Sequence, residues 1–293
     1  MSAAPQVRCV VECRNVLGEG PVWDDVARVL WWIDIAKPAL QRLDPATGKV
    51  DAWTLPGTVG AFVLRRDGGF LFAFRHGLAF VDAPGAEPRP IPAPGARLDA
   101  GRFNDGKCDR AGRFWVGTLD RKLKEPVGEL YRIGPDLSVT TVDRGFTISN
   151  GMAWSPDGRT MYFADTPSRT IFAYDFDAAT GAATGRRMFV RFDDRPGRPD
   201  GCTIDAEGFL WSARVDGGCI DRYAPDGRLD RSLALPVTKP TCCAFGGPDL
   251  ATLYITTATL GIAPDLLAAQ PLAGSLFAAE VGVRGIPEVR FAG

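Results

Sequence analysis

Short apolar runs alternate with glycine-rich turns along the whole chain, and the same order of segments recurs six times. Each repeat begins with a brief apolar segment, passes through a turn such as SPDG (155–158) or DAEG (205–208), and enters a run rich in β-branched and aromatic residues. Such runs predict β-strands rather than helices, and the glycine supplies the positive φ angle that the turn needs. The six runs are VLWWID (29–34), FLFAF (70–74), RFWVGT (113–118), TMYFAD (160–165), FLWSA (209–213) and TLYITT (252–257).

A further predicted strand closes each repeat and usually ends in Asp and a glycine turn, as in LQRLDPATG (40–48) and CIDRYAPDG (219–227). When the repeats are aligned, one position, here called the phase position, recurs every 41 to 50 residues. It is occupied by Glu19, Gly60, Asn104, Asn150, Asp200 and Thr241. This period, with three or four strands per repeat, is typical of a β-propeller blade.

Six such repeats fill the chain almost completely. The sequence therefore predicts an all-β, six-bladed β-propeller with four-stranded antiparallel blades around a central channel, and residues 1–293 as a single domain. A pair of open β-sandwiches is the alternative, but sandwiches do not require a six-fold repeat.

Three segments outside the regular pattern have specific expectations. The N-terminal run RCVVEC (8–13) is expected to complete the last blade and close the ring, and GIAPDLLAAQPLAG (261–274) is expected to contain a short helix. The proline-rich run APGAEPRPIPAPGAR (83–97) is expected to be a rigid surface connection between two blades. The polar run FDDRPGRPDG (192–201) leads into Asp200 and is expected to border the site.

The composition of the chain argues against several classes of function. A hydrophobic content of 45% supports a substantial core, and a net charge of −1 gives no electrostatic footprint for nucleic acid. No stretch approaches the length of a membrane span, and the N-terminus has no apolar signal core. Seven cysteines without a framework spacing indicate reduced thiols, so a cytoplasmic protein is expected. Propellers have few free edges, so a monomer is expected.

Four of the six phase residues, Glu19, Asn104, Asn150 and Asp200, carry a carboxylate or amide oxygen, and closure of the repeats into a ring would bring them together at one rim. Two carboxylates held close together repel each other unless a cation neutralises them. One divalent cation bound by Glu19, Asn150 and Asp200 is therefore expected; Ca²⁺, Mg²⁺ or Mn²⁺ suits the oxygen donors, and Zn²⁺ or Fe²⁺ is possible with waters. The alternative is that these residues only form turns, but Gly60 and Thr241 show that the phase position does not demand a carboxylate.

Other candidate residues lie near the third phase position. Arg102 could hold a ligand oxygen, Asn104 could bond hydroxyl groups, and Asp120 is expected to point toward the same rim. The alternative for Arg102 and Asn104 is a surface arginine and an Asx turn. His76 is the only histidine and no G-x-S-x-G motif is present, so a nucleophile triad is not expected.

Taken in order, several strings of the chain resemble the SMP-30/gluconolactonase/luciferin-regenerating-enzyme family. They are GEGPVW (18–23), RFNDGKCDRAGRFWVGT (102–118), ISNGMAWSPDG (148–158), RPDGCTIDAEGFLW (198–211) and CCAFGG (242–247). The resemblance implies a six-bladed propeller with one divalent metal on the channel axis, with Glu19, Asn150 and Asp200 as ligands. It also implies that Arg102 and Asn104 contact the substrate.

Asp120 departs from the family pattern. Animal members carry acidic residues directly after the Gly-Thr of the third repeat, whereas this chain reads GTLDRK (117–122). Asp120 is expected to stand in for them at a shifted register.

Within the family the chain looks most like bacterial sugar lactonases, xylonolactonases in particular. The resemblance implies hydrolysis of aldonolactones, such as D-xylonolactone or a related pentono- or hexonolactone, to aldonic acids in oxidative sugar catabolism. The cation would polarise the carbonyl, and Asp200 would orient or deprotonate the attacking water; a hydroxide ion held by the cation is the competing nucleophile. A metal-dependent phosphotriesterase or esterase of the same fold, and a non-catalytic propeller that binds partners, are the alternatives.

Overall fold

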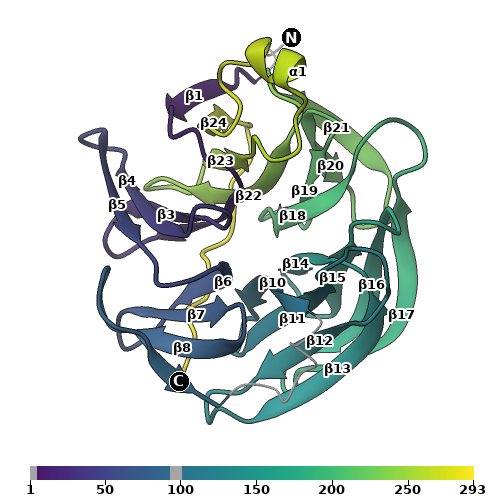
Figure 1. Ribbon diagram of the computed structural model, residues 1–293. Helices are drawn as coiled ribbons and strands as arrows, with labels where there is room; N and C mark the ends of the chain where they lie inside the picture. Colours follow the sequence, from purple (N-terminus) through teal and green to yellow (C-terminus); the bar gives the residue numbers. More distant parts are fainter. Residues whose placement is uncertain (1–4, 93–100) are drawn as a thin grey trace. The chain divides into compact units, whose positions relative to one another are not determined.

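The computed structural model describes residues 5–92 and 101–293. The strands of these residues form six sheets of four strands each. Most of the strands are labelled in Figure 1. The fold is an all-β, six-bladed β-propeller with four-stranded antiparallel blades, which confirms the sequence prediction. The chain divides into two compact units: Met1–Ala52 with Phe192–Pro287, and Trp53–Arg191 with Glu288–Gly293. They are called the first and second unit below, and a single domain over residues 1–293 stays a prediction.

The first unit contains three sheets and the helix. The strands are, in sheet order, β2 (Gly18–Asp24), β3 (Val29–Asp34), β4 (Ala39–Asp44) and β5 (Lys49–Thr54), which runs past the boundary of the unit; β18 (Arg198–Ile204), β19 (Leu210–Val215), β20 (Cys219–Tyr223) and β21 (Leu229–Ala234); and β1 (Arg8–Val11), β24 (Leu276–Glu280), β23 (Thr252–Thr257) and β22 (Pro240–Gly246). The N-terminal strand β1 completes the sheet of the last repeat, as predicted. The helix α1 (Pro264–Ala268) lies within the predicted insertion.

The second unit contains the other three sheets. Their strands are β6 (Val59–Leu64), β7 (Phe70–Phe74), β8 (Gly77–Val81) and β9 (Arg89–Ile91); β10 (Gly101–Cys108), β11 (Phe114–Asp120), β12 (Gly128–Ile133) and β13 (Val139–Phe146); and β14 (Ser149–Trp154), β15 (Thr160–Asp165), β16 (Thr170–Asp177) and β17 (Ala182–Arg191).

Strand β9 corrects one expectation. The run 83–97 was predicted to be only a connection, but Arg89–Ile91 within it forms the outer strand of its sheet. A proline is tolerated there because β9 lies at the sheet edge, where one side of the strand needs no donor for a neighbour. Residues 93–97 of that run lie outside the described residues.

Buried aromatic side chains join neighbouring sheets within each unit. In the second unit the Trp115 ring on β11 lies 5.7 Å from that of Trp154 on β14, and Phe176 packs against both. In the first unit Trp211 on β19 packs edge-on against Phe245 on β22. The strongly apolar second runs of the repeats are therefore explained by burial between sheets rather than by a ligand surface.

A β-bulge or register shift lies at the phase position or directly after it in all six strands that carry it. These leading strands are β2, β6, β10, β14, β18 and β22. Two glycines next to phase residues, Gly20 and Gly151, adopt positive φ angles of 55° and 44°. A bulge interrupts the regular hydrogen-bond ladder and changes the direction in which nearby side chains point. Each leading strand therefore has a local irregularity at its phase position or directly after it.

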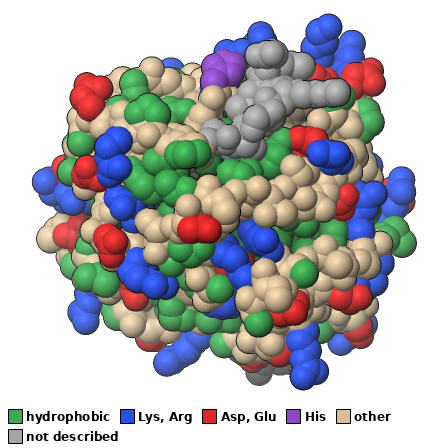
Figure 2. Space-filling view, turned by 90° about the horizontal axis from the view of Figure 1, so that it is seen from below, with side chains coloured by type: hydrophobic (Ala, Val, Ile, Leu, Met, Phe, Trp, Pro, Cys, Tyr) green, Lys and Arg blue, Asp and Glu red, His purple; other side chains and the backbone are tan. Residues whose placement is uncertain are grey.

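Three further observations concern the surface charges, the cysteines and the helices. On the face drawn in Figure 2, Lys and Arg side chains are interspersed with Asp and Glu side chains, in keeping with the net charge of −1. All seven cysteines are free thiols. None of the helices in the described part of the chain is long and apolar enough to cross a membrane.

Candidate active site

The first unit carries the two candidate carboxylates, Glu19 on β2 and Asp200 on β18. Strand β22 packs against both of these strands. Its phase residue, Thr241, donates a hydrogen bond of 2.5 Å from its hydroxyl to the carbonyl of Gly18, the residue before Glu19. This bond fixes the start of β2 against the start of β22.

On its other flank, β22 touches the residue that follows Asp200. A Cβ atom added to Gly201 would lie 2.3 Å from the Cys242 sulfur, so only a glycine allows this approach of β18 and β22. Cys242 directly follows Thr241, so Glu19 and Asp200 lie at the same end of the leading strands on either side of Thr241. Their exposed fractions are only 9% and 7%. The first unit thus buries two carboxylates at one end of three adjacent strands.

The second unit connects three further candidates by hydrogen bonds. The Arg102 guanidinium donates to Asn104 Oδ1 at 2.8 Å, and Asn104 Nδ2 donates to Asn150 Oδ1 at 2.9 Å. Asn150 Nδ2 in turn donates to the Thr166 hydroxyl at 2.9 Å. These contacts orient both amides and hold Arg102, Asn104 and Asn150 together, as the shared phase of the two asparagines predicts.

Asp120 lies at the end of its strand, as predicted, and its side chain also binds the backbone of the following turn. It ends β11 opposite Gly101, the first residue of β10. Its Oδ2 atom accepts hydrogen bonds from the backbone N–H groups of Lys124 and Glu125 at 2.9 and 3.0 Å. These bonds hold the pKa of the Asp120 carboxyl below its usual value. Asp120 therefore shapes the turn after β11, and its contact with a substrate stays a prediction.

Two further aspartates support the leading strands and were not singled out from the sequence. Asp34, at the end of β3, accepts hydrogen bonds from the N–H groups of Val16 at 2.8 Å and Leu17 at 3.1 Å. Asp165, at the end of β15, does the same for the two residues before Ser149, at 3.0 and 2.9 Å. One sequence feature could have identified these two residues: the predicted strands VLWWID and TMYFAD both end in aspartate.

A further carboxyl lies within the β10 bulge, next to Asn104. Burial raises the pKa of Asp105, although the Lys107 ammonium and the N–H groups of Gly106 and Gly151 favour the ionised form. Lys107 also pairs with Glu288 at 3.1 Å. A buried carboxyl with a raised pKa beside a candidate site residue belongs to the site's electrostatic surroundings.

The donor atoms of the predicted ligand set suit a hard divalent cation. Glu19 and Asp200 supply carboxylate oxygens, and Asn150 supplies an amide oxygen whose orientation is fixed by Thr166. Among residues 5–92 and 101–293, no group of three or more His, Cys, Asp and Glu side chains is arranged to hold a metal ion. The predicted set contains only two residues of those types, and the third is an asparagine.

Comparison with known proteins identifies the family of the chain. The model of the SMP-30/gluconolactonase/LRE-like region matches residues 17–259. The chain belongs to this family. Hydrolysis of sugar lactones is typical of this family, and several relatives of the chain are named as lactonases, so the chain is a lactonase-type hydrolase.

Individual relatives match over almost the whole chain. A 6-deoxy-6-sulfogluconolactonase of Pseudomonas putida is 40% identical over 98% of this chain and 99% of its own length. A pentonolactonase of Haloferax volcanii is 39% identical over 96% of each chain. The crystal structure of regucalcin from Agrobacterium tumefaciens, described as a calcium-binding protein, superposes with a TM-score of 0.93 at 32% identity and covers 98% of both chains.

Proposed function

We propose that this protein is a metal-dependent hydrolase that opens aldonolactones to aldonic acids, with D-xylonolactone or a related pentono- or hexonolactone as its substrate. One observation carries the proposal within a lactonase family: Glu19 and Asp200 are buried at one strand end in the first unit, and Arg102, Asn104 and Asn150 are hydrogen-bonded together in the second. The named activities of the Pseudomonas and Haloferax relatives, on a hexonolactone derivative and on pentonolactones, support this substrate class.

The proposed ligands of one divalent cation are Glu19, Asn150 and Asp200. When bound, the cation supplies Lewis-acid polarisation of the lactone carbonyl and stabilises the negative charge that develops on its oxygen. The calcium-binding description of the Agrobacterium relative supports Ca²⁺ as one candidate, beside Mg²⁺, Mn²⁺, Zn²⁺ and Fe²⁺.

Asp200 is the proposed base. It accepts a proton from the attacking water while the water oxygen forms a bond to the carbonyl carbon of the lactone. The bond between that carbon and the ring oxygen then breaks, and Asp200 returns the proton to the departing ring oxygen, which becomes a hydroxyl group. One water is consumed, the product is the aldonic acid, and the carboxylate is regenerated. Such acid–base assistance is worth about 10² to 10⁴-fold in rate.

Arg102, Asn104 and Asp120 are the proposed substrate contacts. The Arg102 guanidinium is anchored by hydrogen bonds of 2.8 Å to the Phe103 carbonyl and to Asn104 Oδ1. An anchored guanidinium loses little conformational freedom when it binds a sugar hydroxyl, so it can orient the lactone ring for attack.

A lactone panel with metal-stripped protein tests the proposal. Release of acid from pentono- and hexono-1,4- and 1,5-lactones is followed with each of the five cations added singly, and spontaneous ring opening is subtracted. We expect hydrolysis that a chelator abolishes and that one cation restores. Full activity in excess chelator would exclude the metal-dependent mechanism, and no lactone hydrolysis with any cation would favour a binding module.

Two controls sharpen this test. A phosphotriester and an aryl ester belong in the same panel, because a higher kcat/KM for either of them would overturn the assignment as a sugar lactonase. Asp200→Asn should lower kcat by about 10² to 10⁴-fold. An Asp200→Asn enzyme with unchanged kcat would exclude this residue as base.

A further inference from the structure

The three strands that carry the predicted ligands share a feature that the other three leading strands lack. In each, the residue before the ligand is paired across the sheet with a buried, charged side chain. The pairs are Gly18 with Asp34, Ser149 with Asp165, and Pro199 with Arg214. The exposed fractions of these charged residues are 4%, 5% and 1%. The corresponding partners in the other strands are uncharged: Phe74, Thr118 and Thr257.

All three charged residues bind the backbone of the segment that leads into the ligand. Asp34 and Asp165 accept hydrogen bonds from N–H groups two to three residues before their ligands. Arg214 instead donates to the carbonyls of Arg195 and Pro196, at 3.2 and 3.4 Å. Arg214 therefore also binds the backbone before its ligand, but it is a cation that donates to carbonyl groups, whereas Asp34 and Asp165 are anions that accept from N–H groups.

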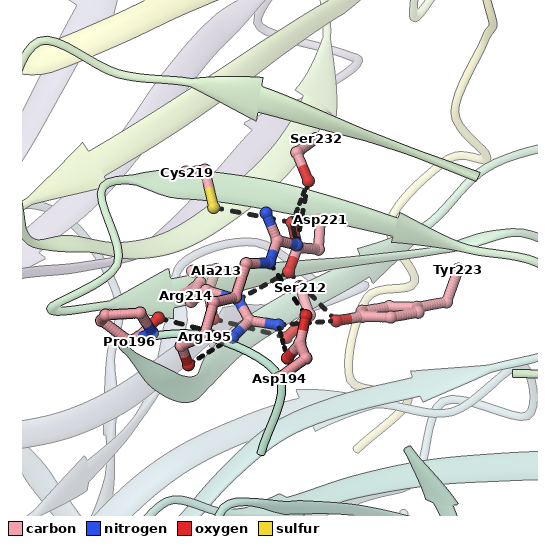
Figure 3. A network of polar contacts seen from close by, with 10 residues as sticks. All are labelled: Asp194, Arg195, Pro196, Ser212, Ala213, Arg214, Cys219, Asp221, Tyr223 and Ser232. Atoms are coloured by element: carbon pink, nitrogen blue, oxygen red, sulfur yellow. Dashed lines mark hydrogen bonds and ion pairs between the residues drawn. The ribbon is translucent and has the colours of Figure 1, made fainter. Parts of the chain in front are cut away.

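Arg214 is also bound by side chains of the next strand, β20, as Figure 3 shows. Its Nε donates to Asp221 Oδ2 at 2.7 Å, and its Nη2 donates to the Tyr223 hydroxyl at 3.3 Å. The same Nη2 donates to Asp194 Oδ1 at 3.2 Å, which adds a side-chain contact to the bound segment. The guanidinium also lies over the Phe192 ring, 4.1 Å from its centroid. A planar guanidinium with several fixed partners defines a position more sharply than a flexible ammonium group does.

The bound segment also forms part of an open cavity. Arg195 and Pro196 line a cavity of about 430 Å³ together with Asp216, Thr238 and Gln270. The segment therefore contacts the buried guanidinium and also borders the cavity, and it continues into β18 and Asp200. Any shift of residues 194–196 would change both the cavity wall and the approach of the chain to Asp200.

We propose that Arg214 is a positioning residue of the lactonase, which fixes residues 194–199 and through them the carboxylate of Asp200. Its role for Asp200 matches that of Asp34 for Glu19 and of Asp165 for Asn150. This inference rests on the proposed function, because the position of Asp200 matters for catalysis only if Asp200 binds the cation and acts as the base.

The same sheet offers a matched control. Arg222 is 2% exposed and donates from Nε to the fully buried Asp205 at 2.8 Å. Asp205 binds the N–H groups of Glu207 and Phe209 in the turn after β18, which is at the opposite end of that strand from Asp200. The two buried arginine–aspartate pairs thus support the two ends of one strand, and only one of those ends carries Asp200.

Arg214→Lys and Arg222→Lys are compared in three measurements. Both variants should lower Tm. Only Arg214→Lys should weaken Mn²⁺ binding, measured by electron paramagnetic resonance, and lower kcat with saturating metal, each by about 10 to 100-fold, with a smaller change in KM. Only Arg214→Lys should also speed hydrogen–deuterium exchange in peptides covering 192–199. Equal effects of the two variants on kcat, Mn²⁺ affinity and this exchange would overturn the proposal.

These readouts separate the two hypotheses. If wild-type protein hydrolyses no lactone but Arg214→Lys still weakens Mn²⁺ binding and loosens 192–199, the proposed function fails and the positioning role stands. If wild-type protein is active and Arg214→Lys matches Arg222→Lys, the positioning role fails alone. Should Arg214→Lys not fold, Tyr223→Phe removes a single partner of Arg214 and should produce the same exchange pattern at smaller amplitude; normal exchange there would refute the proposal.

Discussion

Replacing Gly60 by alanine is a direct test of how closely the leading strands of the second unit approach one another. A Cβ atom at Gly60 would lie 2.3 Å from the Phe103 carbonyl oxygen and 2.8 Å from that of Asn104. Both are backbone atoms of β10, so neither can rotate away. The shorter distance is about 1 Å below ordinary van der Waals contact, and β6 must therefore shift away from β10.

The expected cost follows from this forced shift. Overpacking of a well-packed interior typically destabilises by about 1–3 kcal/mol. For a domain of about this size each kcal/mol lowers Tm by roughly 2–4 °C, so Gly60→Ala should lower Tm by about 2–12 °C. Activity should fall as well, because Asn104 donates the 2.9 Å hydrogen bond that holds Asn150.

Calorimetry and lactonase kinetics on Gly60→Ala check both expectations, and Gly57→Ala is the control. A Cβ atom at Gly57 would meet no atom within 4 Å, and this glycine has no positive φ angle, so its Tm and kcat/KM should match or exceed those of wild-type protein. A Gly60→Ala protein with wild-type Tm and kcat/KM would show that the sheets are not packed as closely as described.

Three further predictions concern other buried groups. Asp205→Asn should cost about 1.5–3 kcal/mol in urea unfolding, because Arg222 loses the one fully buried carboxylate among its three partners, while Glu207 and Asp230 stay paired with it; a loss below about 1 kcal/mol would contradict this. Burial raises the pKa of Cys219 to about 12, so iodoacetamide at about pH 8 should leave this thiol unmodified in native protein, as judged by mass spectrometry. Backbone N–H donors lower the pKa of Asp120, so its stabilisation is complete above the unfolded-state pKa of about 3.9 and is lost as pH falls through the lower folded-state pKa. The stability difference between wild-type protein and Asp120→Asn should therefore shrink over that acidic range and stay constant near neutral pH.

The sequence predicts the fold well where a strand is buried and poorly where it is not. The second run of every repeat is strongly apolar because it packs between sheets, and each of these runs is a strand in the structure. The outermost strands could not be placed individually. Most of β17 is exposed, and β9 contains a proline, so neither has the alternation that identifies a half-buried strand.

The candidate site shows the same limit at the level of single residues. Alignment of the repeats predicts Glu19, Asn150 and Asp200 as candidate ligands, because turn glycines fix the phase of each repeat. It does not identify the charged residues opposite them, because the register between two strands decides which side chain faces which segment. Asp165 in sequence is only the end of an apolar run, and Arg214 is one arginine among many.

The six phase residues differ in the structural contacts that they already make. Gly60 is excluded from ligand chemistry because the backbone of β10 leaves no room for a side chain. Thr241 uses its hydroxyl to bind the Gly18 carbonyl, and Asn104 uses its amide to orient Asn150. Asn150 is also hydrogen-bonded through both ends of its amide, so hydrogen bonding alone does not separate it from Asn104. What Glu19, Asn150 and Asp200 share is a strand whose preceding residue is paired with a buried charged residue. This shared support agrees with the predicted ligand set, which stays a prediction.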